Sequence, residues 1–271
     1  MNTDITIGQM YPANSVVHRL DPRFKIIFTI AFVVMLFIST SPFSMALCLV
    51  FMLVSYALSK IPFSMLIKTL KPVIPNVLFM LVFNMFFYNG ETVLFKAWIL
   101  KLTREGIETA VFMVFRIVIL IAGTSLLTFT TSSIQLTDAI ESLLSPLKIF
   151  KFPVHDLAMM MTIALRFIPT LIDETQKIMS AQKSRGADFE SGNIMRRVKA
   201  LLPILIPLFI SAVKRATELA TAMESRCYNN GIGRTKMKKL KTAARDYVSA
   251  FVMLLVLAGV VVLNIFTQNI I

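Results

Sequence analysis

Four long apolar runs dominate the pattern of the chain. Residues 26–59, 72–90, 117–137 and 247–271 contain no Asp, Glu, Lys or Arg. About 20 helical residues are needed to cross a hydrocarbon core about 30 Å thick, and each run is close to or above that length. The pattern therefore predicts an all-α integral membrane protein.

The first run holds 34 residues, which is too long for one crossing. Pro42 disfavours helix at the residue before it and lacks a backbone donor, so we expect a helical hairpin that breaks at residues 39–42. With the other runs this gives about five transmembrane helices, expected at residues 24–38, 43–58, 72–87, 105–129 and 245–266.

Residues 132–242 have a different pattern. Their two apolar stretches, 157–172 and 200–213, are interrupted by Arg166 and by prolines and continue into polar sequence. We therefore expect three amphipathic helices outside the membrane core, at residues 133–147, 153–184 and 194–228. The predicted division is 1–131 for transmembrane helices one to four, 132–242 for a cytoplasmic domain and 243–271 for the last transmembrane helix.

Composition and charge support this arrangement. The chain is 56% hydrophobic with a net charge of +13, and residues 177–245 carry 15 Lys or Arg against four carboxylates. Such a segment could face nucleic acid, lipid headgroups or a protein groove. In a membrane protein, the positive-inside rule places it and the N-terminus in the cytoplasm. Five crossings then put the C-terminus outside.

Two of the expected amphipathic helices end in related sequences. "AQKSRGAD" and "AMESRCY" align when Arg185 is matched with Arg226, 41 residues later. Each arginine would lie at a helix C-terminus, where the helix dipole favours positive charge, and could enter an acidic groove. The alternative is that both arginines are solvated or only set topology. Gly186 suits a left-handed helix end, whereas at Cys227 such a backbone would be strained or absent.

Small and polar side chains suggest where helices pack. Ala212, Ala216 and Ala220 recur every four residues and would let another helix cross closely. The intramembrane residues Asn76, Asn84 and Arg116 are interpreted as hydrogen-bonded contacts between helices rather than as a solute path.

Motifs for catalysis are missing from the sequence. No GxxxxGK[ST] phosphate loop occurs, so we expect no ATP binding by this chain alone. The two histidines are isolated, and the two cysteines match no metal-ligand or redox spacing. We therefore predict a non-catalytic protein without a cofactor or a metal site.

Three motifs together resemble one known family. "HRLDPRFKI", residues 18–26, resembles the N-terminal signature of the transmembrane T component of energy-coupling factor (ECF) vitamin transporters, through Leu20, Asp21, Pro22 and Arg23. "AQKSRGAD" and "AMESRCY" resemble the paired Ala-Arg-Gly motifs of the same family. The resemblance covers essentially the whole chain in the right order, with Cys227 standing where the second motif usually has Gly.

This resemblance implies a membrane scaffold with cytoplasmic coupling helices. In that family the arginine ends dock in grooves of two ATP-binding cassette ATPase subunits, which bind the ATP, and a small membrane S component captures the vitamin. One scaffold can accept several interchangeable S components. By resemblance, the ATPase-docking residues here would be Ala181, Ser184, Arg185, Gly186, Ala222, Ser225 and Arg226.

Other functions stay open on the sequence alone. A homologous scaffold serves dedicated cobalt or nickel importers, and nothing in the chain names the solute. A stand-alone secondary carrier is disfavoured because paired intramembrane charges are missing. A membrane anchor that binds nucleic acid through its basic segment is disfavoured by the apolar content of that segment. We therefore expect the lipid bilayer and protein subunits, and no nucleic acid, as partners.

Overall fold

A computed structural model describes residues 10–87, 93–97, 100–150, 153–187, 189, 194–228, 240 and 242–268. The chain divides into two compact units. Unit 1 contains Met1–Ala139 and Leu240–Ile271, and unit 2 contains Ile140–Lys239. Each unit is described by itself.

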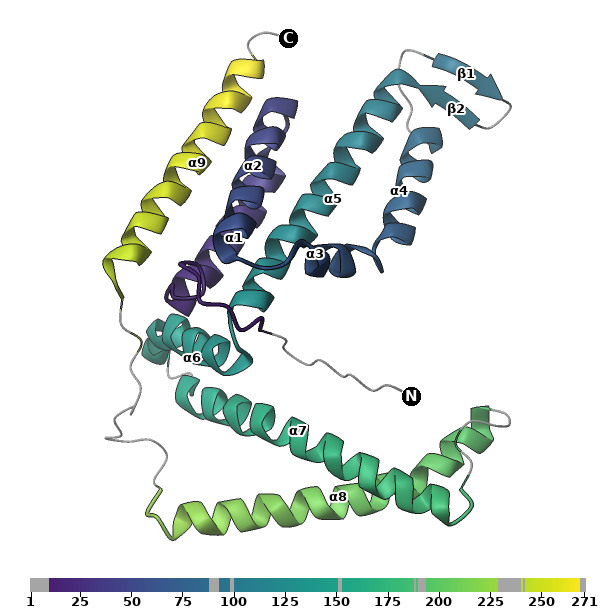
Figure 1. The fold of residues 1–271 in the computed structure, drawn as a ribbon, viewed down its shortest axis with the longest axis vertical. Helices are drawn as coiled ribbons and strands as arrows, with labels where there is room; N and C mark the ends of the chain where they lie inside the picture. The colour runs from purple at the N-terminus through teal and green to yellow at the C-terminus, as the bar shows by residue number, and fades with distance from the viewer. Residues whose placement is uncertain are drawn as a thin grey trace. The chain divides into compact units, whose positions relative to one another are not determined.

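Unit 1 is built from apolar helices (Figure 1). The helices α1, α2 and α5 contact one another, α9 packs against α1 and α2, and α3 and α4 pack against α5. Their bounds are α1 Pro22–Ile38, α2 Pro42–Ser59, α3 Phe63–Leu70, α4 Ile74–Phe87, α5 Arg104–Thr130 and α9 Ala244–Gln268.

Prolines and caps set the starts of the first two helices. Pro22 begins α1 after Asp21, whose carboxylate accepts from the Arg23 backbone N–H at 2.9 Å. Pro42 begins α2 after Ser41, which forms a capping box with Ser44. The expected hairpin break is therefore confirmed, because α1 ends at Ile38 and α2 begins at Pro42.

The hairpin turn is held by two other helices. The Asn264 side chain of α9 donates to the Ile38 carbonyl at 2.7 Å and accepts from the Thr40 and Ser41 backbone N–H groups at 3.3 and 3.4 Å. Arg116 of α5 donates to the Ser39 carbonyl at 2.5 Å. Arg116 thus joins helices as expected, because lone polar groups among apolar helices are satisfied by neighbouring backbone. Asn84 instead donates to Met80 of its own helix at 3.0 Å.

Close packing at one glycine brings α1 against α5. A Cβ atom on Gly123 would lie 2.2 Å from the Phe32 ring, so only glycine allows this approach. Phe32 belongs to the buried core of unit 1 together with Met35, Cys48 and Ile119. The core therefore lies where α1, α2 and α5 meet.

Between α4 and α5 the chain forms a short antiparallel hairpin of β1 (Val93–Ala97) and β2 (Leu100–Thr103). No strand was expected at this place from the sequence. Apart from this hairpin the described elements are helical, and the expected all-α membrane class is confirmed.

Among the described residues, five helices are long and apolar enough to span a membrane: α2, α5, α7, α8 and α9. The pair α3 and α4, bent by 57°, passes the same test as one broken span. Length and composition alone therefore do not separate α7 and α8 from the transmembrane helices. The placement of residues 132–242 in the cytoplasm stays a prediction.

Unit 2 contains two long helices, α7 (Val154–Ser184) and α8 (Ile194–Glu224). They follow α6 (Ser133–Leu144), which includes the boundary between the units, and the 3-10 turn η1 (Ser145–Phe150). The helix expected at residues 133–147 is thus shorter, because the chain tightens to 3-10 geometry around Pro146. The end expected at Ser184 is confirmed, and α7 begins at Val154, one residue after the start expected at Pro153, which is the N-cap.

Candidate functional site

The end of α7 is a complete Schellman motif. Arg185 caps the helix, and Gly186 follows in the left-handed region with φ of +86°. The Gly186 N–H donates to the Lys183 carbonyl at 3.0 Å, and the Ala187 N–H donates to the Gln182 carbonyl at 3.0 Å. These are the two hydrogen bonds that define the motif. They fix Arg185 at the last position before the chain turns away.

The end of α8 repeats the same backbone geometry. Cys227 takes the place of Gly186 with φ of +55°. Its N–H donates to the Glu224 carbonyl at 2.9 Å, and the Tyr228 N–H donates to the Met223 carbonyl at 3.0 Å. The left-handed backbone is therefore present at Cys227, although a side chain there costs about 1–2 kcal/mol relative to glycine. Of the two alternatives expected from the sequence, the one in which the left-handed backbone is absent at Cys227 was wrong.

Both helix ends present an arginine to solvent. Arg185 and Arg226 are exposed, and within the part of the chain that the structure describes neither guanidinium forms a hydrogen bond or an ion pair. The neighbouring serines turn back onto their helices, because the Ser184 and Ser225 hydroxyls donate to the Ser180 and Ala222 carbonyls at 3.1 and 3.0 Å. Ala181 and Ala222, one turn earlier, are exposed as well. Each end is therefore a small surface with one protruding cation.

An ion pair fixes how α7 and α8 cross. Glu174 of α7 accepts from Arg215 of α8 at 2.7 Å and from the Ser211 hydroxyl at 2.5 Å. The Tyr228 hydroxyl, after the end of α8, donates to the Met159 sulfur near the start of α7 at 2.6 Å. An early residue of α7 thus meets a late residue of α8, so the two helices run antiparallel (Figure 1).

The two arginines lie at equal distances from the crossing of α7 and α8, and the helix segment between the crossing and each arginine is called an arm. Glu174 and Arg215 are 41 residues apart, the same spacing as Arg185 and Arg226. Each arginine therefore follows its member of the Glu174–Arg215 pair by 11 residues. At 1.5 Å per residue each arm is about 16 Å long, and because the arms point in opposite directions the two helix ends lie about 33 Å apart. The repeat thus generates a nearly two-fold arrangement of cationic ends.

The alanine stripe does not lie at this crossing. Ala216 and Ala220 are exposed and Ala212 is half-buried, whereas the contact with α7 uses Ser211 and Arg215. Adjacent positions on a helix point about 100° apart, because one turn takes 3.6 residues. The stripe therefore remains available to a helix of another chain, and its expected close crossing stays a prediction.

The N-terminal motif forms a buried hub in unit 1. Asp21 caps α1 and donates its backbone N–H to the Asp246 carboxylate of α9 at 2.9 Å. Asp246 also accepts from the Ala243 N–H at 2.7 Å. The Lys25 ammonium donates to the Thr130 carbonyl at the end of α5 at 2.9 Å. The motif thus joins α1 to the places where α5 ends and α9 begins.

The other members of the motif support this hub. Pro22 is buried at the first position of α1, Leu20 is half-buried, and Arg23 lies 4.0 Å from the Asp21 carboxylate. His18, just before the motif, hydrogen-bonds through its ring to Ser15 at 2.7 Å and to the Tyr11 carbonyl at 3.0 Å. Burial lowers the pKa of the His18 imidazole from its ordinary value, because burial disfavours the charged form.

A large apolar surface also runs along α8. Phe209 is 70% exposed and Met195 is 69% exposed. Further side chains of α8 with large exposed fractions are Leu201, Leu202, Leu205, Ile206, Ile210 and Val213. A surface of this extent marks contact with lipid or with another protein.

Several of these residues were not found from the sequence. Neither Glu174 nor Asp246 had a role assigned from the sequence. The 41-residue spacing that relates Arg185 to Arg226 also relates Glu174 to Arg215, and this signal could have identified the pair. No sequence signal links Asp21 to Asp246, because 225 residues separate them.

Apolar helices long enough to span a membrane and two matched cationic helix ends define a multi-pass membrane protein whose two long paired helices end in exposed arginines. Among the described residues no cluster of His, Cys, Asp or Glu could hold a metal ion. Residues 13–238 match the family described as CbiQ, cobalt transport protein.

Curated relatives agree over nearly the whole chain. Energy-coupling factor transporter transmembrane proteins of Acidaminococcus fermentans and Clostridium kluyveri are 52% and 53% identical to it, over 94% and 92% of this chain and 94% and 93% of theirs. That of Bacillus subtilis is 47% identical over 96% of this chain and 97% of its own. The chain therefore belongs to the family of ECF transporter transmembrane proteins, as the motifs predicted. These relatives do not favour the alternative of a dedicated cobalt or nickel importer.

Proposed function

We propose that this chain is the non-catalytic scaffold that couples ATP hydrolysis in two partner ATPases to substrate uptake through a membrane S component. Arg185 and Arg226 each enter an acidic groove on one ATPase subunit. Guanidinium groups suit such grooves because they can bind several oxygens at once. The single observation that carries this proposal is the pair of equal arms with unpartnered arginines at their ends.

The symmetry of the arms supports two similar partners. Both ends have the same Schellman geometry, the same preceding serine and the same distance from the crossing. Two related ATPase subunits side by side offer two similar grooves, and ends about 33 Å apart leave room for one subunit at each end. ATP-driven movement of the subunits would then change the angle between α7 and α8 around the Glu174–Arg215 contact.

The apolar surface of α8 supports a membrane partner. We assign its exposed side chains to contact with the S component, which captures a vitamin or related micronutrient. Several S components can bind this surface in turn. The exposed methionines Met160 and Met195 suit a surface that accepts more than one partner, since methionine adapts its shape.

The same proposal fixes the orientation. Residues 132–242 and the N-terminus lie in the cytoplasm, where ATP is available, and the C-terminus lies outside after α1, α2, α4, α5 and α9 have crossed. The chain itself binds no ATP and needs no cofactor, in keeping with a sequence that has no phosphate loop.

The test is a double substitution in the reconstituted complex. Arg185→Ala together with Arg226→Ala should lower both ATPase co-purification and ATP-dependent uptake at least about tenfold, as expected for buried charge contacts between proteins. Lys177→Ala with Lys214→Ala is the matched control, because it removes two exposed charges from the middle of the same helices. Uptake at the wild-type rate by the double arginine variant would refute the proposal.

A further inference from the structure

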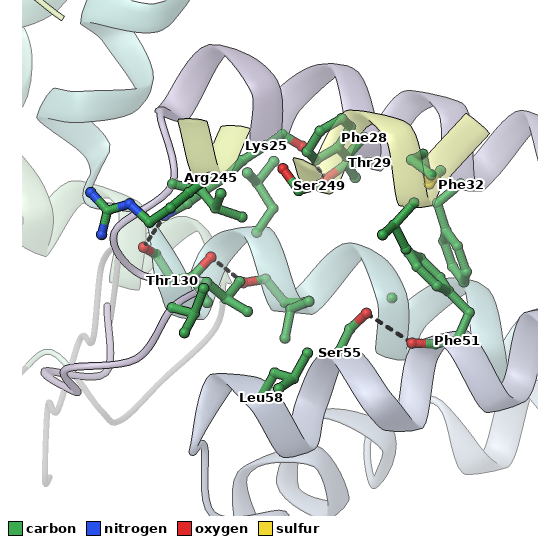
Figure 2. A pocket seen from close by; sticks show the side chains of 18 of the residues that line it. Lys25, Phe28, Thr29, Phe32, Phe51, Ser55, Leu58, Thr130, Arg245 and Ser249 are labelled. Carbon is green, nitrogen blue, oxygen red and sulfur yellow. Dashed lines mark hydrogen bonds between the residues drawn. The ribbon is translucent and has the colours of Figure 1, made fainter. Parts of the chain in front are cut away.

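A cavity of about 530 Å³ lies in unit 1 between α1, α2, α5 and α9 (Figure 2). Its wall is mainly apolar and includes Phe28, Leu58 and Val252. Its volume lies within the range of about 300–1,000 Å³ in which proteins hold small molecules. The proposed coupling function makes no use of this cavity.

The two ends of the cavity differ in polarity. Figure 2 shows Lys25, Thr130 and Arg245 at one end and the rings of Phe32 and Phe51 at the other. Lys25 lies in the first turn of α1, Thr130 is the last residue of α5, and Arg245 is the second residue of α9. These three positions belong to the same membrane face, because α1 and α9 begin where α5 ends. The cavity is therefore polar at one membrane interface and apolar towards the bilayer interior.

The polar end holds two cations, Lys25 and Arg245, and two buried carboxylates, Asp21 and Asp246. Lys25 is 5% exposed, and its ammonium donates to two neutral carbonyls, Thr130 at 2.9 Å and His18 at 3.2 Å. The carboxylates nearby, Asp21 and Asp246, accept from backbone N–H groups.

The two cationic side chains at this end differ in how their charge is met. Lys25 is attracted by the buried carboxylates of Asp246 and Asp21, although no direct ion pair with either is formed among the described residues. Arg245 is exposed at the mouth of the cavity, and over the ranges that the structure describes it forms no ion pair. Arg245 is therefore the cation at this end that is available to an anionic ligand.

We propose that this cavity binds one anionic phospholipid. Its acyl chain fills the apolar end, and its phosphate binds at Arg245 and Lys25. A cavity with an apolar wall excludes water, so in the bilayer its natural occupant is hydrocarbon. A phospholipid joins hydrocarbon to an anionic group at the interface, and basic residues beside transmembrane helices attract anionic lipids. Polarity, charge and location thus select the same ligand.

The test uses the delipidated full chain in detergent, titrated with phosphatidylglycerol or with phosphatidylcholine of the same acyl chains. Native mass spectrometry counts the retained lipid. We expect one phosphatidylglycerol per chain, retained at least about fivefold more strongly than phosphatidylcholine, and about fivefold weaker retention in Arg245→Ala, since one interfacial basic residue contributes about that factor. Arg19→Ala is the control, because Arg19 is exposed and does not line the cavity.

A second pair of variants distinguishes the cavity from the lipid annulus. Ser55→Phe fills the cavity without changing charge and should abolish retention. Val50→Phe, on the same helix but 55% exposed and away from the cavity, should leave it unchanged. If Ser55→Phe lowers the thermal stability, Val252→Phe fills the cavity from α9 instead.

Three results would overturn the proposal: equal retention of the two lipids, equal retention by the Ser55→Phe and Val50→Phe variants, or displacement of the lipid by inorganic phosphate alone.

Discussion

Asp246 holds together the hub that joins α1, α5 and α9, and its removal gives the most direct stability prediction. The residue is 1% exposed, and its two carboxylate oxygens accept from the backbone N–H groups of Asp21 and Ala243 at 2.9 and 2.7 Å. Asp246→Ala removes the acceptor of the buried Asp21 N–H and of the part-buried Ala243 N–H. A buried donor that loses its acceptor costs about 1–3 kcal/mol and a donor that water can reach costs less, so the free energy of unfolding should fall by about 1–4 kcal/mol.

Asp246→Asn separates the two hydrogen bonds. The amide oxygen can accept from one backbone N–H, while the amide NH₂ group faces the other donor, so about half of the loss should remain. Reversible unfolding in mixed micelles measures the free energy, and hydrogen exchange at the Asp21 and Ala243 amides reports whether each N–H has lost its acceptor. Glu218→Ala, at an exposed carboxylate of α8, should change stability by less than about 0.5 kcal/mol. Equal stability of the Asp246→Ala and Glu218→Ala variants would refute the assignment of the hub.

Further predictions concern the helix ends, the crossing and the N-terminal segment. Cys227→Gly should raise the stability of the α8 end by about 0.5–1 kcal/mol, because relief of the strain in the left-handed backbone exceeds the added entropy of the unfolded chain, and the Tyr228 amide should then exchange more slowly. Gly186→Ala should lower the stability of the α7 end by about 1 kcal/mol, and the Ala187 amide should then exchange faster. Glu174→Ala should lower the thermal unfolding temperature of the wild-type chain but change that of the Arg215→Ala variant only slightly, since the two side chains form one contact. Equal decreases in the wild-type chain and in the Arg215→Ala variant would contradict the ion pair. Stability should also fall as the pH drops below 6.5, the ordinary pKa of histidine, because burial lowers the pKa of His18 in the folded chain and the unfolded chain therefore binds the proton first. His18→Gln should weaken this pH dependence. An unchanged pH profile of stability in that variant would contradict the buried imidazole.

Local signals in the sequence predicted much of the fold. Pro42 marked the hairpin break, Pro153 marked the start of α7, and Gly186 marked its left-handed end, because each of these residues restricts or permits specific backbone angles. The resemblance in the N-terminal and arginine motifs predicted the family. These features depend on one residue and its immediate neighbours, so one sequence is enough to find them.

Other features were not predictable from residue type and spacing alone. Cys227 keeps a left-handed backbone because the two hydrogen bonds of the Schellman motif offset its cost, and the residue type alone argued against it. The role of Asp246 depends on a partner 225 residues away. Ala216 and Ala220 predicted a close helix crossing, yet the contact of α8 with α7 uses the adjacent positions, since spacing gives a shared face but not what covers it.

The central claim is that the two arginine ends face the cytoplasm and bind the ATPases, and the natural cysteines allow a direct measurement. Cys227 is exposed beside Arg226, whereas Cys48 is buried in the core of unit 1. A membrane-impermeant maleimide should label Cys227 in inside-out vesicles but not in intact cells, and bound ATPase subunits should protect it. Cys227→Ser should remove the label. Labelling of Cys227 in intact cells would place the end of α8 outside and contradict the account.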